Sequence, residues 1–272
     1  MSIHRLKPID QIVSIDGREI SNRFPPYIIA ELSCNHSGSI EKAYALIDAA
    51  KKAGADAVKL QTYTPAELCK PDCELWDLYE KAKTPREWHS ELFLYARTVG
   101  ITIFSSAFSV DGVDFLESLD TPAHKIASME IRELPLVNAA LRTGKVVIVS
   151  TGMATGADIG LLNLSTNVIL LHCVAQYPAK IEDANLNAIK SLQRFCNLVG
   201  LSDHTPGYET AIAATALGAV MIEKHFKLDD DCIDAAYSLN PEQFSVMCKA
   251  VRAVWHGMGD GLIRPTCEPR QR

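Results

Sequence analysis

Short apolar runs alternate along the chain with stretches of helical periodicity. Four of the runs follow a helical stretch that ends in glycine, and they cover residues 53–61, 99–104, 143–149 and 217–222. Four more runs cover residues 27–31, 123–128, 168–172 and 197–201. Glycine past a helix end is the usual left-handed stop, and strands that are apolar throughout are typical of a parallel sheet buried on both faces. The pattern therefore predicts a chain built of αβ units.

The stretches between the runs carry helix start signals. Ser39 precedes residues 40–53, which place Ala43, Leu46, Ile47 and Ala50 on one face and so predict a capped amphipathic helix. Residues 84–87 combine a capping threonine, a proline and an acid, which is typical of another helix start. Eight strands with intervening helices predict an α/β protein, a (β/α)8 TIM barrel. A doubly wound open sheet is the alternative.

Three further segments complete the expected organisation. Residues 1–20 are predicted to hold a small N-terminal hairpin, turning at an Asp-Gly pair, that caps the bottom of the barrel. Residues 21–262 would form the catalytic barrel, and residues 263–272 would begin a linker to an absent C-terminal domain. Within the barrel, residues 65–83 are expected to be a long loop that forms a lid or rim over the site.

Composition narrows the class of protein. The 272 residues are 47% hydrophobic, enough for a large single core. A net charge of -6 and a pI near 5.8 argue against nucleic acid or an anionic membrane as partner. The eight cysteines are scattered without a Cys-x-x-Cys pair, as expected of reduced thiols, and no apolar run approaches the roughly 20 residues of a membrane span. We therefore expect a cytoplasmic enzyme.

Polar residues gather at the predicted carboxyl ends of the strands, where a barrel enzyme keeps its catalytic groups. In chain order they are Glu31, Lys59, Gln61, Ser105, Ser106, Lys125, Ser128, Glu130, Ser150, Thr151, His172, Ser202, Asp203, His204, Glu223, Lys224 and His225. A structural protein has no reason to place chargeable groups at every strand end, so the pattern indicates a ring of converging functional loops.

Two histidines stand out in this ring. His204 and His225 each follow a short apolar run, and the two runs are successive in the chain. Imidazoles at adjacent strand ends could share one metal ion, because neutral imidazole suits borderline divalent metals. The alternative is that each is a loop histidine held by a hydrogen bond.

The lysines and serines of the ring suggest an anion site. Lys59, Lys125, Ser128, Ser150 and Ser202 would offer two cations and several hydroxyl donors to a small phosphorylated acid. Two other interpretations stay open. Each lysine could form a barrel-interior ion pair with a ring glutamate, or a desolvated lysine could form a Schiff base with a carbonyl substrate.

Six ordered motifs resemble those of the sialic acid synthase family, and they cover residues 30–36, 53–62, 125–128, 150–154, 201–205 and 222–226. Two further segments, residues 75–89 and 234–239, are similar to the pseudaminic acid synthases of that family. The resemblance implies a (β/α)8 barrel that condenses phosphoenolpyruvate with an amino-sugar aldehyde, and it implies a homodimer. It also implies a divalent metal, Mn²⁺ or Mg²⁺, and a 2,4-diacetamido-2,4,6-trideoxyhexose as the sugar. Relatives that make N-acetylneuraminate or legionaminate are the alternatives.

The resemblance also implies roles for individual residues. The metal ligands would be His204 and His225. Phosphoenolpyruvate would be held by Lys59, Ser106, Lys125, Ser128, Ser150 and Ser202. The carboxylates near the reacting carbons would be Glu31, Glu130 and Glu223, and the sugar would face Gln61, Tyr177 and Asp234.

The sequence departs from the family pattern in three places. Ala175 stands where the family has Asn or Ser, and the proline usual after the serine pair at 105–106 is missing. The sequence stops where members continue into an antifreeze-like domain that supplies an arginine to the partner's site. We expect the first departure to weaken phosphoenolpyruvate binding and the last to raise the Michaelis constant. A non-catalytic sugar-binding derivative of the family is therefore a third hypothesis.

Overall fold

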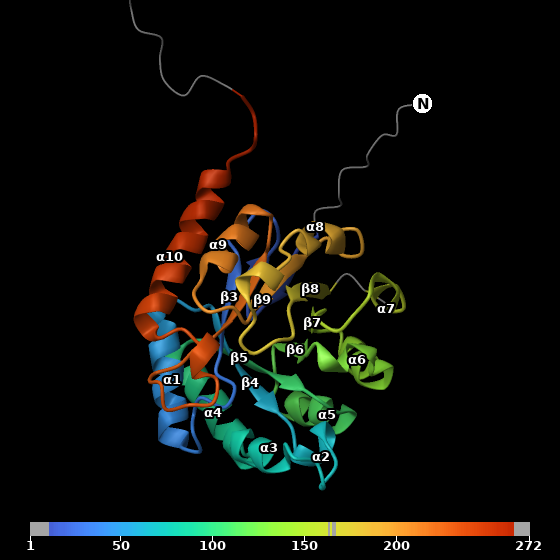
Figure 1. The fold of residues 1–272 in the computed structure, drawn as a ribbon, viewed down its shortest axis with the longest axis vertical. Helices are drawn as coiled ribbons and strands as arrows, with labels where there is room; N and C mark the ends of the chain where they lie inside the picture. Colours follow the sequence, from blue (N-terminus) through green and yellow to red (C-terminus); the bar gives the residue numbers. More distant parts are fainter. Residues whose placement is uncertain (1–10, 163, 165–166, 264–272) are drawn as a thin grey trace, which may run out of the picture.

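The computed structural model describes residues 11–162, 164 and 167–263, and eight parallel strands close into a barrel within them (Figure 1). The strands are β3 (Tyr27–Glu31), β4 (Ala57–Thr62), β5 (Thr102–Ala107), β6 (Ala123–Ile126), β7 (Val146–Ser150), β8 (Val168–Cys173), β9 (Val199–Asp203) and β10 (Met221–His225). Neighbours in sequence are neighbours in the barrel, and β10 pairs with β3 to close it. The predicted (β/α)8 barrel is confirmed, and the open sheet is excluded.

Helices surround the barrel. They are α1 (Ile40–Ala53), α2 (Pro65–Leu68), α3 (Trp76–Ala82), α4 (His89–Val99), α5 (Val110–Ser118), α6 (Leu134–Arg142), α7 (Gly156–Gly160), α8 (Ala188–Leu192), α9 (Glu209–Ala216) and α10 (Pro241–Met258). Short 3-10 turns cover Arg86–Trp88 (η1), Met129–Arg132 (η2), Ile181–Asp183 (η3) and Ala235–Tyr237 (η4). The last helix, α10, packs against α1 and α9, so the outer layer closes where the barrel closes (Figure 1). No helix in the described ranges is long and apolar enough to cross a bilayer.

The first helix forms where the sequence predicts it. The Ser39 hydroxyl accepts a hydrogen bond from the backbone N–H of Lys42 at 3.1 Å and so satisfies one of the free donors at the start of α1. Gly54 ends the helix at φ 101°, a left-handed conformation that only glycine adopts without strain. Leu46 and Ile47 are fully buried against the barrel.

The segment after β4 differs from its prediction. Residues 65–83 lie in the predicted long connection after β4, but they contain two short helices, α2 and α3, that the sequence did not predict. Thr64 and Glu67 form a reciprocal capping box at the start of α2, which supplies the local reason for a helix there. The next helix, α4, begins at His89, later than the predicted start, because the 3-10 turn η1 precedes it.

A small antiparallel hairpin of β1 (Val13–Ile15) and β2 (Arg18–Ile20) lies at the amino ends of the barrel strands. The hydroxyl of Thr102, the first residue of β5, donates to Asp16 of the hairpin turn at 3.1 Å. The side chains of Val13, Ile15 and Ile20 join the hydrophobic core. The hairpin therefore occupies the bottom of the barrel, whereas residues 1–10 and 264–272 of the predicted flanking segments lie outside the described residues.

One glycine inside the barrel is required by close packing. A Cβ atom on Gly200 of β9 would lie 2.3 Å from the carbonyl oxygen of Met221 and 2.7 Å from Cδ2 of Leu171. Both distances are below van der Waals contact, so β8, β9 and β10 approach one another closely only because this position has no side chain.

Candidate active site

A small cavity of about 40 Å³ lies inside the barrel at the carboxyl ends of the strands. All but two of the predicted site residues line it: Glu31, Lys59, Gln61, Ser106, Lys125, Ser128, Ser150, Tyr177, Ser202, His204, Glu223 and His225. Side chains along a strand point alternately into and out of the barrel, so alternate residues of each strand converge on this point. The predicted convergence of these residues is thus what the structure shows.

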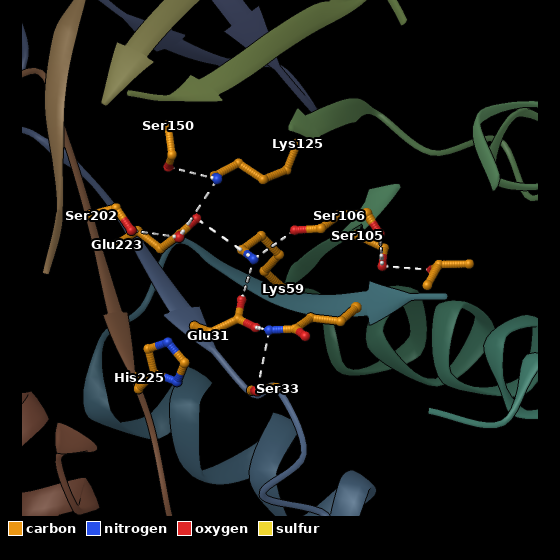
Figure 2. Close-up of polar contacts among 12 residues, drawn as sticks. Glu31, Ser33, Lys59, Ser105, Ser106, Lys125, Ser150, Ser202, Glu223 and His225 are labelled. Carbon is orange, nitrogen blue, oxygen red and sulfur yellow. Dashed lines mark hydrogen bonds and ion pairs between the residues drawn. The ribbon is translucent and has the colours of Figure 1, made fainter. Parts of the chain in front are cut away.

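Four charged side chains form the centre of the site (Figure 2). Lys59 lies between two glutamates, with its Nζ 2.5 Å from Glu31 Oε2 and 3.9 Å from Glu223 Oε2. Lys125 Nζ lies 4.0 Å from Glu223 Oε1. All four side chains are buried. We call these residues the charge cluster; it contains two basic and two acidic side chains.

Burial and mutual attraction shift the pKa values of the charge cluster in different directions. Burial opposes ionisation of Glu223, but Lys125 and Lys59 outweigh it and lower the pKa of this carboxyl. Burial also opposes the charge on Lys59, but the two glutamates outweigh it and raise the pKa of this lysine. Burial raises the pKa of Glu31, although the nearby Lys59 opposes this shift. Burial also lowers the pKa of Lys125, and the attraction of Glu223 offsets that shift only in part. The pKa values of the two glutamates are therefore shifted in opposite directions, so Glu31 is suited to act as an acid and Glu223 as a base.

Serine hydroxyls complete the floor of the site. Lys59 donates to Ser106 Oγ at 2.9 Å, and Lys125 donates to Ser150 Oγ at 2.7 Å. Ser202 donates to Glu223 Oε1 at 3.0 Å. Each lysine therefore shares its ammonium with a hydroxyl group, a combination that suits the oxygens of a carboxylate or phosphate.

The two predicted metal ligands lie at adjacent strand ends with their ring centroids 5.4 Å apart. His204 Nδ1 lies 2.9 Å from the carbonyl oxygen of Val174, which can only accept, and His225 Nδ1 lies 3.0 Å from Asp234 Oδ2. In the neutral form each ring therefore carries its proton on Nδ1, which leaves the lone pair of Nε2 for a metal ion.

The donor set fits a divalent ion with open coordination positions. Within the described part of the chain, no group of three or more His, Cys, Asp or Glu side chains could hold a metal. An ion held by the Nε2 atoms of His204 and His225 would therefore take its remaining ligands from substrate and water. This arrangement is typical of exchangeable catalytic metals rather than closed structural sites.

Two predicted site residues lie outside the cavity lining. Asp234 stands behind His225 and accepts hydrogen bonds from its Nδ1 and from the Tyr237 hydroxyl. Burial opposes ionisation of Asp234, but His225 outweighs it and lowers the pKa of this carboxyl. Glu130 lies on η2, and burial raises its pKa; its Oε2 is a buried atom without a hydrogen-bond partner among the described residues.

Four polar strand residues point away from the cavity, so the expectation that every polar strand end joins the ring is wrong for them. Ser105 bonds Thr62 on the outer face of the sheet, and His172 Nε2 lies 2.7 Å from the carbonyl oxygen of Ala184. Asp203 and Lys224 pair with each other, also on the outer face. The reason is the two-residue period of a strand, which sends each of them opposite to its inward neighbour.

Sequence reasoning missed three cavity residues, Phe108, Ala127 and Cys173. Cys173 lines the cavity, and its Sγ lies 3.7 Å from His204 Nδ1; Phe108 lines it beside Tyr63, with ring centroids 5.4 Å apart. Alanine, phenylalanine and a single cysteine do not stand out beside an apolar run, so no local signal marked them. Strand alternation could have found Cys173, because it lies one residue beyond the outward His172.

The chain is similar to enzymes of nonulosonate synthesis. The model of the NeuB family matches residues 46–262. The chain is 45% identical over 260 residues to pseudaminic acid synthase of Campylobacter jejuni, covering 87% of this chain and 76% of that protein. It is 44% identical over 259 residues to pseudaminic acid synthase of Helicobacter pylori, with the same coverage of 87% and 76%. The crystal structure of N-acetylneuraminic acid (sialic acid) synthetase from Leptospira borgpetersenii in complex with citrate matches with a TM-score of 0.89 and 30% identity, over 94% of this chain and 93% of that one.

Proposed function

This chain belongs to the NeuB family, and from that premise we propose that it condenses phosphoenolpyruvate with an N-acetylated amino-sugar aldehyde and releases phosphate. The sugar we propose is a 2,4-diacetamido-2,4,6-trideoxyhexose, and the product a nine-carbon 2-keto acid of the pseudaminic type. Identity of 45% to a pseudaminic acid synthase supports the choice of sugar. The observation that carries the proposal is the charge cluster beside two imidazoles with free Nε2 atoms.

Phosphoenolpyruvate would bind to the cationic floor of the barrel. Lys59 and Lys125 would hold its carboxylate and phosphate, with donors from Ser106, Ser150 and Ser128. A cavity of about 40 Å³ has room for little more than one water molecule. Binding therefore requires the lysines to exchange their contacts with the cluster glutamates for contacts with the substrate.

A divalent ion, Mn²⁺ or Mg²⁺, would be held by His204 and His225. When bound, such an ion supplies Lewis-acid polarisation of the sugar aldehyde. Tyr177, which is half exposed and stacks at a tilt on His204 with centroids 4.2 Å apart, would face the sugar at the mouth of the site. Gln61 donates to Glu31 Oε1 at 3.0 Å and would contact the sugar from the opposite side.

The glutamates would carry the proton transfers. The methylene carbon of phosphoenolpyruvate attacks the aldehyde carbon, and water adds to the oxocarbenium carbon that results. Glu223, with its lowered pKa, is suited to accept the proton of that water, and Glu31, with its raised pKa, is suited to hold a proton for transfer. The tetrahedral carbon then expels phosphate by C–O cleavage, so the bridging oxygen leaves with phosphorus. Glu130 remains a third candidate carboxylate.

Phosphate release with three candidate sugars tests the proposal. We expect turnover with the diacetamido trideoxyhexose to exceed turnover with N-acetylmannosamine or the legionaminate precursor, and bridging ¹⁸O to appear in phosphate. Lys125→Met should abolish release, whereas Lys145→Met on the exterior, where Lys145 pairs with Glu117, should not. Preference for N-acetylmannosamine would overturn the choice of sugar, and binding of both substrates without phosphate release would support the non-catalytic alternative.

A Schiff-base aldolase is the second candidate, because burial lowers the pKa of Lys125. Lys59 is less suited, since its pKa is raised and Glu31 lies 2.5 Å away. EDTA would leave an aldolase active, and borohydride with substrate would inactivate it covalently. We expect the opposite result in both treatments.

We also propose a homodimer in the cytoplasm. The proposal draws on the family for the dimer and on the thiols for the location, since every cysteine in the described part of the chain is free. Light scattering on the purified chain measures its mass directly, and a monomer at working concentration would contradict the dimer.

A further inference from the structure

A buried ion pair lies on the outer face of the barrel, directly behind the two imidazoles. Lys224 Nζ lies 2.9 Å from Asp203 Oδ2, and the two side chains are 0% and 2% exposed. The two residues are direct partners across the β9–β10 ladder. Asp203 immediately precedes His204, and Lys224 immediately precedes His225, so each charge is covalently next to one imidazole.

The ion pair also hydrogen-bonds the backbone of Thr205, the residue that follows His204. Asp203 Oδ1 accepts hydrogen bonds from the backbone N–H of Thr205 at 3.0 Å and from its hydroxyl at 2.8 Å. Lys224 Nζ donates to the carbonyl oxygen of Thr205. Thr210 of α9 donates to Asp203 Oδ2 at 2.8 Å. Both polar groups of the Thr205 peptide backbone are therefore fixed by residues that flank the histidines.

The neighbouring strands do not need such a pair to pack. Ala30 of β3 is the ladder partner of Lys224 on its other side, and Leu60 occupies the outward position beyond Lys59 on β4. Both are buried apolar residues. Apolar side chains can replace a buried ion pair without loss of stability, so stability alone gives no reason for charges here.

From these contacts we propose that Asp203 and Lys224 are positioning residues that set the separation and direction of the His204 and His225 rings. The inference rests on the proposed metal site. Lys224 extends from the β10 backbone beside His225, and its ammonium group contacts the backbone that follows His204. It therefore links the backbone next to one imidazole to the backbone next to the other. Groups that orient metal ligands in this way typically change metal affinity about 10- to 100-fold when removed.

Titration of the purified chain with Mn²⁺, followed by the electron paramagnetic resonance signal of free Mn²⁺, tests this role. The double variant Asp203→Asn with Lys224→Met removes both charges and leaves neither buried alone. We expect it to bind Mn²⁺ about 10- to 100-fold more weakly than the unmodified chain. Phosphate affinity, measured by calorimetry without metal, should not change, because the charge cluster lies on the inner face.

Two further variants keep the test decisive. Thr210→Val removes the hydrogen bonds of this hydroxyl to Asp203 and to the Thr205 hydroxyl at nearly constant volume. It should weaken Mn²⁺ binding a few-fold in a folded protein even if the double variant unfolds. Asp56→Asn changes a carboxylate that pairs with Arg252 at the amino end of β4, and it should leave Mn²⁺ affinity unchanged whatever it does to stability.

The outcomes separate the two proposals. If the unmodified chain does not bind Mn²⁺, the metal site of the proposed function fails. If the unmodified chain binds Mn²⁺ and both the double variant and Thr210→Val bind it equally well, the positioning role is overturned while the metal site stands. A drop in Mn²⁺ affinity for Asp56→Asn as large as for the double variant would also overturn it, because the effect would then be one of general stability.

Discussion

Glu223→Gln is the most informative single change, because it removes the carboxylate with the lowered pKa from the charge cluster without changing its shape. Glu223 lies 3.9 Å from Lys59 Nζ and 4.0 Å from Lys125 Nζ. Lys59 keeps Glu31 as a partner after the change, whereas Lys125 has no other carboxylate within 4.0 Å among the described residues. The variant therefore leaves an unbalanced ammonium group in the barrel interior.

The structure sets the scale of the effect. At an effective dielectric constant of about 20, two unit charges about 4 Å apart attract by about 4 kcal/mol. Glu223 makes two such contacts, and the cost of burying its own charge offsets part of the sum. Removing one partner from a buried ionic group costs about 3–5 kcal/mol. At about 2 °C per kcal/mol for a chain of this size, the melting temperature should fall by at least about 6 °C.

An added anion should reverse part of this loss. Phosphate can occupy the space between the two lysines, and at a hundred times its Kd it stabilises a protein by about 2.7 kcal/mol. Thermal unfolding with and without phosphate should show a larger rise for Glu223→Gln than for the unmodified chain, which still has the competing carboxylate. Glu117→Gln is the control, since Glu117 pairs with Lys145 and with the buried ring of His124, away from the charge cluster. An unchanged melting temperature, or an equal phosphate effect in both proteins, would refute the reasoning.

Three other predictions concern the metal site, the barrel packing and the pH dependence of stability. Asp234→Ala should weaken Mn²⁺ binding about 10- to 100-fold, because His225 loses its Nδ1 partner; unchanged affinity in a Mn²⁺ titration would contradict this. Gly200→Ala should lower the free energy of unfolding by about 1–3 kcal/mol, measured by urea denaturation, because its Cβ would overlap the Met221 carbonyl; a loss below about 0.5 kcal/mol would show that the strands adjust. Burial lowers the pKa of His89 to about 4 and that of His36 to about 4, from 6.5. The unfolded chain then binds more protons below pH 6.5, so each histidine should cost about 3 kcal/mol of stability as the pH falls from about 6.5 to about 4. Urea midpoints at pH 7.5 and 5.5 measure the slope, and a flat profile would count against it.

Local signals predicted the elements that depend on neighbouring residues. The helix at 40–53 has both its cap and its glycine stop within the sequence, and it forms with the predicted bounds. The eight apolar runs became the eight barrel strands, since continuous apolar character is required by burial on both faces. The convergence of polar groups also followed from fold class, because all parallel strands end on one side of the barrel.

Other features depend on contacts between distant segments, and local patterns did not predict them. The Thr64 and Glu67 capping box was readable from sequence, but the helices at 65–83 were missed because proline and cysteine there suggested a loop. The outward direction of Asp203 and Lys224 follows from alternation once the inward neighbours are known. Their hydrogen bonds to the Thr205 backbone do not follow from alternation, because these bonds depend on how β9, β10 and the loop after β9 are arranged in space.

The hairpin covers the bottom of the barrel, so the charge cluster faces an opening at the carboxyl ends of the strands. The side chains of Val13, Ile15 and Ile20 fill the barrel at the amino ends of its strands. A sugar resting across that opening would trap any smaller molecule below it, so the two reactants would have to arrive in a compulsory order, the three-carbon acid before the sugar.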